Sequence, residues 1–139
     1  MTTADPVEHI RRWSDAFTAL RRDLHAHPEL GFEEHRTARL VGDQLSSWSI
    51  EHHAGIGRTG IVAVVPGRVD KSGRRIGLRA DMDALPMQEE NDVTYRSRYD
   101  GADRGAMLHS SRYDFNDGVI PLGAGFLARI AERAMPLHA

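Results

Sequence analysis

Two short runs rich in β-branched residues lie close together near the middle of this 139-residue chain. The first run, GIVAVVPG, covers residues 60–67, and the second, RRIGLRA, covers residues 74–80. Runs of this kind, bounded by glycine or proline, are typical of β-strands. The link between Val65 and Arg75 is too short for the helical crossover that joins parallel strands. We therefore expect a small mixed or antiparallel sheet within residues 50–80.

Apolar residues that recur at steps of three and four predict three helices around this sheet. The first helix covers residues 7–26 and starts behind an Asp-Pro pair, which suits a helix N-terminus. The second covers residues 33–48, and the third covers residues 118–135 behind the capping candidates Asn116 and Asp117. The apolar stripe of the first helix consists of Ile10, Trp13, Phe17, Leu20 and Leu24.

The composition supports one folded domain. Hydrophobic residues make up 40% of the chain and charged residues 27%, as in soluble globular proteins. Residues 91–107 lack a sustained apolar period and are expected to form a loop. The predicted fold class is α/β, with a small mixed or antiparallel sheet packed by three helices in a single domain.

Charge and cysteine content exclude several classes of function. A formal net charge of -2 gives no electrostatic reason to expect binding to nucleic acid or to a membrane surface. No apolar run reaches the length of a membrane-spanning helix, and the first ten residues lack the pattern of a signal peptide, so we expect a cytoplasmic protein. The chain has no cysteine, which excludes disulfides, thiolate nucleophiles and cysteine-ligated metals.

Eight histidines raise the question of a metal site, but their spacing favours structural roles. His25 and His27 are two residues apart near a helix end, so their side chains point to different sides. His52 and His53 are adjacent and would point to opposite faces of a strand. The histidines expected on exposed helix faces or at the C-terminus are His9, His35 and His138.

The stretch LRADMDALPMQEE carries a sharper chemical signal. Asp81 and Asp83 would follow a strand, where α/β proteins tend to build their sites, and alternate residues share one strand face. A solvated Asp-rich turn accounts for the same spacing. His109, in MLHSSRYDFND, lies ahead of a helix, and a local bond to Asp114 or Asp117 is the alternative to a role in a site. Spacing leaves both questions open.

Three segments stand out together, RRDLHAHPELGFEE, LRADMDALPMQEE and MLHSSRYDFNDGVIPLGAGFLARI. In this chain order they resemble parts of the zinc-type amidohydrolases related to hippurate hydrolase, the N-acyl-amino-acid amidohydrolases and the plant auxin-conjugate hydrolases. We call them the first, second and third motif. The first two resemble the opening part of that family's catalytic domain, and the third resembles its final segment. The resemblance implies hydrolysis of the amide bond in small N-acyl amino acids with a divalent metal, zinc, manganese or cobalt.

The resemblance also implies a truncated catalytic domain of the zinc-peptidase type. In the family, the Tyr-Asp-Gly stretch leads into a segment resembling MHACGHDGHT, and then to further ligands, the catalytic Glu and an inserted dimerisation domain. Here the third motif follows directly after the seam DGADRGA, residues 100–106. The chain is therefore expected to be one partial catalytic domain, residues 1–139, without the dimerisation domain. It would consist of an N-terminal segment, residues 1–102, and a C-terminal segment, residues 103–139.

Only part of the family's metal site carries over. His109 matches a metal-ligating histidine, and Asp83 matches the acidic residue of the catalytic site that helps to orient the metal. Asp81 stands where some relatives place a ligating histidine. A hydrolytic metal needs about three protein ligands and an open position for water, and these residues fall short of that set. Glu89 and Glu90 belong to the second motif and do not replace the catalytic Glu.

Two hypotheses follow. In the first, the chain is a metal-dependent hydrolase of N-acyl amino acids whose active form needs the absent portion. In the second, it is a catalytically inert remnant that acts at most as a small binding or interaction domain. Missing strands would leave unpaired amides and apolar surface, which predicts a marginally stable or aggregation-prone protein. The oligomeric state stays open because the dimerisation domain is absent.

Overall fold

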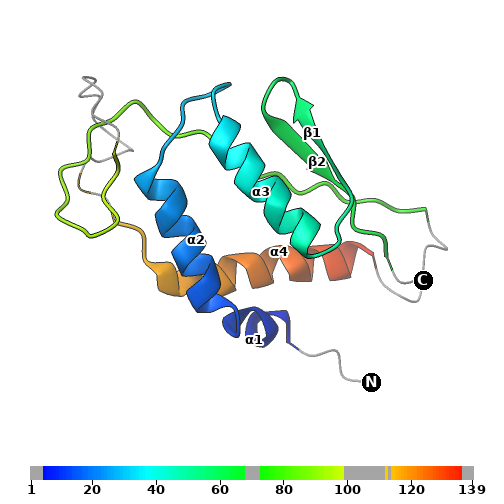
Figure 1. Ribbon diagram of the computed structural model, residues 1–139. Coiled ribbons are helices and arrows are strands. Elements are labelled where there is room, and N and C mark those ends of the chain that lie inside the picture. The colour runs from blue at the N-terminus through cyan, green and yellow to red at the C-terminus, as the bar shows by residue number, and fades with distance from the viewer. Residues whose placement is uncertain (1–4, 68–72, 99–111, 113, 136–139) are drawn as a thin grey trace. The chain divides into compact units, whose positions relative to one another are not determined.

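The structure is a computed structural model, and it describes residues 5–67, 73–98, 112 and 114–135 (Figure 1). The combination of helices with one small antiparallel sheet agrees with the expected α/β class. In chain order, the elements are the helices α1 (Pro6–Arg11), α2 (Ser14–Ala26) and α3 (His35–Ser47), the strands β1 (His52–Ile56) and β2 (Gly60–Ala63), the 3-10 helix η1 (Asp117–Val119) and the helix α4 (Ile120–Ala134).

Two of the three predicted helices are confirmed by α3 and α4, whereas the first predicted helix is interrupted. The Trp13 N–H donates to the Ile10 carbonyl at 2.9 Å, three residues back, and this tightened turn ends α1 before α2 begins. The apolar stripe continues through the interruption, so its periodicity gives no sign of the break. Within the described parts of the chain, no helix combines the length and the apolar character that crossing a membrane requires.

The sheet is antiparallel, but the predicted strand pairing is wrong. β1 pairs with β2, with His52 opposite Ala63, and residues 74–80 form no strand. Pairing β1 with β2 closes only a tight turn, which costs less conformational entropy than closing the loop to residues 74–80. The turn uses left-handed backbone at Gly57 (φ 59°) and Arg58 (φ 96°). The sequence of β1, HHAGI, has few β-branched residues and therefore gave no strand signal.

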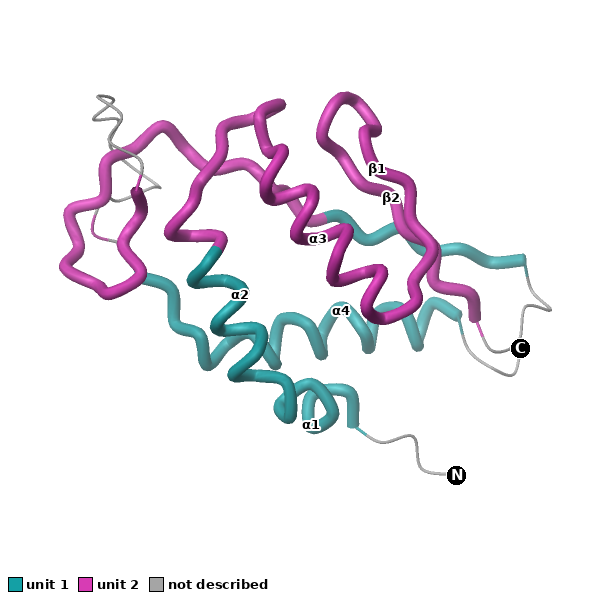
Figure 2. Tube along the Cα trace, viewed as in Figure 1, with its two compact units in different colours: residues 1–23, 68–79, 114–139 teal, residues 24–67, 80–113 magenta. Residues whose placement is uncertain are grey.

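The described residues divide into two compact units (Figure 2). Unit 1 contains residues 5–23, 73–79 and 114–135, and unit 2 contains the remaining described residues. The boundary between the units falls within α2, between Asp23 and Leu24. The expected loop, residues 91–107, has no helix or strand in its described part, which ends at residue 98. The expected division between residues 102 and 103 lies outside the described residues.

In unit 1, α1 packs closely against α4. Gly125 of α4 permits this approach, because a Cβ at that position would lie 2.5 Å from Val7 Cγ2. Arg129 of α4 also donates to Asp5 Oδ1 at 3.2 Å. Asp5 in turn caps α1 by accepting from the Val7 N–H at 3.1 Å, as the Asp-Pro pair predicted. One close backbone approach and one ion pair thus hold the two ends of the chain's described part together.

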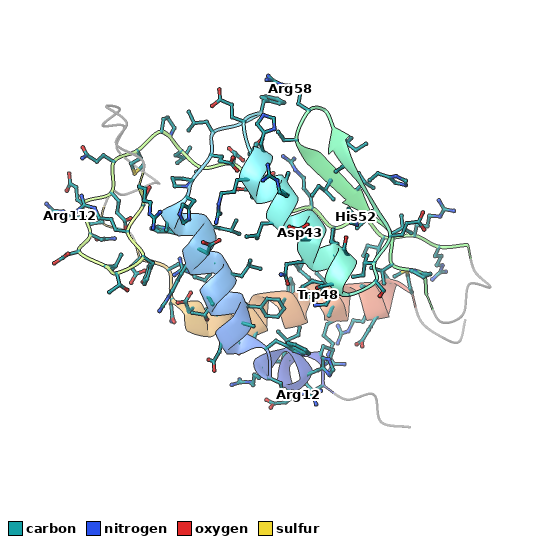
Figure 3. The ribbon with its side chains drawn as sticks, viewed as in Figure 1. Arg12, Asp43, Trp48, His52, Arg58 and Arg112 are labelled. Carbon is teal, nitrogen blue, oxygen red and sulfur yellow. The ribbon has the colours of Figure 1, made fainter. Side chains whose placement is uncertain are left out.

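In unit 2, α3 lies against the β1–β2 hairpin. A Cβ on Gly42 of α3 would lie 3.3 Å from Nε2 of His52, which Figure 3 labels on β1. At the hairpin turn, the buried Thr59 donates its hydroxyl to the Glu34 carboxylate at the start of α3. The hairpin is therefore fixed to α3 at both of its ends.

Little apolar surface is buried in the described part of the chain. Ala26 is the one buried hydrophobic residue there, and no large side chain is fully enclosed. The sequence analysis expected exposed apolar surface, whereas the truncation of the domain and its marginal stability stay predictions. Large side chains that are about half exposed or more include Val62, Val64, Val65, Leu78, Leu122 and Phe126.

Candidate functional site

The first and second motifs lie side by side in unit 2. The Ala84 N–H donates to the Glu29 carbonyl at 2.8 Å, which joins the two motifs through their backbones. Two side chains join them again, because His25 Nε2 of α2 lies 3.0 Å from Glu89 Oε2. The chain thus brings two of the three family-like segments together, although many residues separate them in sequence.

Glu89 is the centre of this contact. Its residue surface is only 8% exposed. Besides His25, its carboxylate accepts from the Ser97 N–H at 2.6 Å and from the Asn91 side-chain amide at 3.3 Å. The Glu89 carbonyl accepts from Arg96 Nη2 at 2.6 Å. These bonds hold the stretch after the second motif as a closed loop against α2.

The pKa of Glu89 reflects this balance of contacts. Burial raises the pKa of Glu89, but the hydrogen bonds from Ser97 N–H and from His25 outweigh burial and leave the pKa below its usual value. The carboxylate is therefore ionised at neutral pH and acts as an acceptor. The His25 ring also packs edge-on against Tyr95, with ring centroids 5.8 Å apart. This cluster is built as an anchor between two segments.

Glu29, in the first motif, fixes the start of α3. Its two carboxylate oxygens accept from the Arg36 N–H at 2.8 Å and from the Thr37 N–H at 2.7 Å. These amides lack partners within the helix, so the carboxylate takes the place of an N-cap side chain. Burial raises the pKa of Glu29, but the two backbone donors outweigh it and the pKa is lowered.

In unit 1, the third motif contacts the first motif through Asp117. The Arg21 Nε–H donates to one Asp117 oxygen, and the Arg22 Nε–H donates to the other at 2.9 Å. The hydrogen bond from Arg21, more than any other contact, lowers the pKa of Asp117. Arg21 also lies over the Phe115 ring, 5.5 Å from its centroid.

The neighbouring Asn116 caps η1, with its side chain accepting from Gly118 N–H at 3.0 Å. Helix α2 therefore contacts both of the other motifs, one in each unit.

The structure describes two of the three predicted site residues. Asp81 and Asp83 are both exposed, and the stretch before them is not the strand that was expected to present them. His109 lies outside the described residues. Across the ranges that the structure describes, no three His, Asp or Glu side chains gather in a way that could hold a metal ion. The assignment of Asp81, Asp83 and His109 to a site stays a prediction.

The anchoring roles of Glu29 and Glu89 were not predicted. Glu29 follows a proline and precedes a predicted helix, which is a weak local signal for capping. Glu89 has no such signal, because its partner on α2, His25, is 64 residues away in the chain. The structural role expected for His25 agrees with this pair.

Comparison with known proteins identifies relatives for most of the chain. It is 38% identical over 112 residues to "Hippurate hydrolase" of Campylobacter jejuni, which covers 81% of this chain and 27% of the relative. It is 40% identical over 111 residues to "N-acyl-L-amino acid amidohydrolase" of Geobacillus stearothermophilus, which covers 77% of this chain and 28% of the relative. The chain belongs, over the stretch it matches, to this amidohydrolase family.

The family also includes a relative named as a peptidase. "Thermostable carboxypeptidase 2" of Saccharolobus solfataricus is 34% identical over 124 residues, which covers 88% of this chain and 29% of the relative. The chain thus spans less than a third of the length of these three relatives. No family model matches the chain, and no solved structure matches it.

Proposed function

We propose that this chain is part of the catalytic domain of a metal-dependent hydrolase that cleaves the amide bond of small N-acyl amino acids of the hippurate type. The observation that supports this most is the 38% identity over 112 residues to a protein named hippurate hydrolase. The N-acyl-L-amino acid amidohydrolase at 40% identity points to the same substrate class. The second part of the proposal is that the 139-residue chain by itself does not turn over substrate.

The donor set of the chain supports the second part of this proposal. Zinc hydrolases hold their metal with about three protein ligands and leave one position for water. Asp81 and His109 are the proposed ligands for zinc, manganese or cobalt, and Asp83 is the proposed orienting acid. The chain has no cysteine, and no third donor joins Asp81 and Asp83 among the described residues. Because these residues do not fit a complete hydrolytic centre, no catalytic step is assigned to them.

Three acids that are buried or partly buried hold the fold together. Glu29 and Glu89 accept from backbone amides, and Asp117 is engaged by two arginines. A carboxylate occupied in this way stabilises the fold and is not available to take a proton from water. The described part of the chain therefore supplies the scaffold on which the family's motifs are held.

A second candidate function is that of a catalytically inert remnant that acts as a small binding or interaction domain. The exposed apolar side chains favour this alternative, since large exposed apolar patches mark interaction surfaces. The two candidates share their ancestry and differ in whether a complete site can be assembled.

A direct assay tests the statement that the chain alone does not turn over substrate. The purified 139-residue chain is incubated with hippurate and zinc, manganese or cobalt, and the release of benzoate is measured together with bound metal per chain. We expect no benzoate above the protein-free control and less than one metal per chain. His109→Ala serves as the matched variant, because it removes the one histidine ligand that the resemblance carries over.

Benzoate release that accompanies about one bound metal per chain, and that His109→Ala abolishes, would show that the chain alone is an enzyme. The statement on turnover would then be wrong. Benzoate release that His109→Ala leaves unchanged would point to a contaminating hydrolase, and repurification would remove it.

A further inference from the structure

Glu29 is held by its side chain and by its backbone at the same time. Its carboxylate accepts from the amides of Arg36 and Thr37, at 2.8 and 2.7 Å, at the start of α3. Its backbone carbonyl accepts from the Ala84 N–H at 2.8 Å, in the second motif. All of these residues belong to unit 2, so the contacts lie within one compact unit. One residue of the first motif therefore joins the start of a helix to the second motif.

The start of α3 depends on a carboxylate from outside the helix. Glu34 occupies the N-cap position, but its side chain makes no capping bond. The Glu34 carboxylate instead accepts from the Thr59 hydroxyl at the hairpin turn. Arg36 and Thr37 are the second and third residues of α3, and their amides are the ones that an N-cap side chain normally engages. Glu29 takes over this role, and α3 in turn fixes the Glu29 side chain.

The hydrogen bond at Ala84 acts directly on Asp83. The Ala84 N–H belongs to the peptide group that Asp83 forms with Ala84, and this group is planar. A bond to it therefore limits rotation about the backbone angle ψ of Asp83. Asp83 lies at the surface and outside any helix or strand, so regular secondary structure does not fix its backbone. Its direction consequently depends on individual contacts such as the one from Glu29.

From this geometry we propose that Glu29 is a positioning residue for Asp83. The cap on α3 holds Glu29, and the Glu29 carbonyl holds the peptide group that follows Asp83. Helix α3 thereby becomes the rigid support that sets the direction of the Asp83 carboxylate. The inference rests on the proposed function, in which Asp83 is the acid that orients the metal. It adds a residue that acts on the site through Asp83.

A capping role alone makes a different prediction. Replacing the Glu29 side chain removes no atom of the hydrogen bond to Ala84, because that bond uses the backbone carbonyl. If Glu29 only caps α3, loss of its carboxylate frees the Arg36 and Thr37 amides and leaves Ala84 as it was. If Glu29 positions Asp83, the loss also reaches Ala84. The Ala84 amide therefore distinguishes the two roles.

The test measures amide hydrogen exchange by NMR in the 139-residue chain without added metal. Glu29→Ala removes both acceptor oxygens of the side chain, and Glu29→Gln keeps one. We expect Glu29→Ala to speed exchange at Arg36, Thr37 and Ala84 at least ~10-fold more than at Ser97, as for the loss of a helix cap. Glu29→Gln is expected to give a smaller increase at the same three amides. The Asp83 Cα resonance, which reports the backbone angles of that residue, is expected to move with Ala84.

Two controls separate a local effect from a general loss of stability. The Ser97 amide also lies in unit 2, but it is held by the Glu89 carboxylate at 2.6 Å, so it reports on the unit as a whole. Glu33→Ala removes an exposed acid from the same motif, and we expect it to leave the exchange at Ala84 and the Asp83 resonance unchanged. If Glu29→Ala does not fold, Glu29→Gln carries the same comparison, with an expected excess of at least ~3-fold over Ser97.

Three results would overturn the inference. In the first, Arg36 and Thr37 exchange faster while Ala84 and the Asp83 resonance stay unchanged, which leaves Glu29 as a cap and nothing more. In the second, all four amides speed up equally, so that the substitution only lowers the stability of the unit. In the third, no amide changes. The measurement needs neither turnover nor bound metal, so failure here is distinct from failure of the proposed function, which the benzoate assay tests.

Discussion

The second motif has two ends with opposite surroundings. At its start, Asp81 and Asp83 are exposed to solvent. Near its end, Glu89 is almost fully buried and accepts hydrogen bonds from Ser97 and His25. A buried carboxylate is costly unless donors surround it, whereas an exposed one is hydrated at no cost to the fold. The difference indicates that acids only a few residues apart have different surroundings, with Glu89 held in the fold and Asp81 and Asp83 at the surface.

The largest expected effect comes from removing the buried acid. Glu89→Ala leaves the Ser97 N–H and the His25 ring without their acceptor, so we expect the free energy of unfolding to fall by about 2–4 kcal/mol. Urea denaturation followed by circular dichroism measures this change. If the variant is largely unfolded in buffer, the loss of signal before any urea is added is itself the expected outcome.

Glu90→Ala is the matched control for this prediction. Glu90 is the next residue, and its carboxylate pairs with Arg112, labelled in Figure 3, at 2.9 Å, with more than half of both side chains exposed. Exposed ion pairs of this kind contribute little, so a loss below about 1 kcal/mol is expected. Equal losses in the two variants would mean that the two acids do not differ in role.

Lowering the pH is expected to have an intermediate effect on the stability of the folded chain. Glu29 and Glu89 have a lower pKa in the folded chain than in the unfolded chain. Such groups contribute stability above their unfolded pKa, and the contribution is lost as the pH falls through the folded pKa. The urea midpoint is therefore expected to fall as the pH drops below about 4.3, the ordinary value for glutamate. Titrating the midpoint between pH 7 and pH 3 measures this loss.

Glu29→Gln tests whether the cap on α3 is one source of that slope. Loss of a charged cap is expected to cost about 0.5–2 kcal/mol at pH 7 and to make the acid dependence shallower. Glu33→Gln, at an exposed position in the same motif, serves as the control. A slope that Glu29→Gln leaves unchanged would assign the acid sensitivity to other groups.

Local patterns predicted the helices better than the sheet. Periodicity located α3 and α4, and the Asp-Pro pair located the start of α1, because each of these signals lies within a few residues of what it specifies. The strand prediction failed because β propensity marks a run that suits a sheet and does not name its partner. The run at residues 60–67 was assigned to the wrong neighbour for that reason.

The anchoring contacts of Glu89 and Asp117 could not be predicted from local sequence patterns either. The bonds of Glu89 to His25 and of Asp117 to Arg22 join residues that are 64 and 95 positions apart. No spacing rule reports such a pair, since it depends on how the motifs pack. The resemblance to a family, in contrast, does not depend on how the motifs pack, because it draws on the sequence of whole segments.

The smallest effect is expected at the exposed end of the second motif. Asp83→Asn keeps the shape of the side chain and removes its charge at a solvated position, so we expect the free energy of unfolding to change by no more than about 0.5 kcal/mol. The measurement is urea denaturation at pH 7 beside Glu89→Ala. A loss above about 1 kcal/mol at Asp83 would place this acid among the structural anchors and remove it from the proposed site. A silent substitution there, beside a destabilising one at Glu89, leaves the proposed assignment of Asp83 to a site in place.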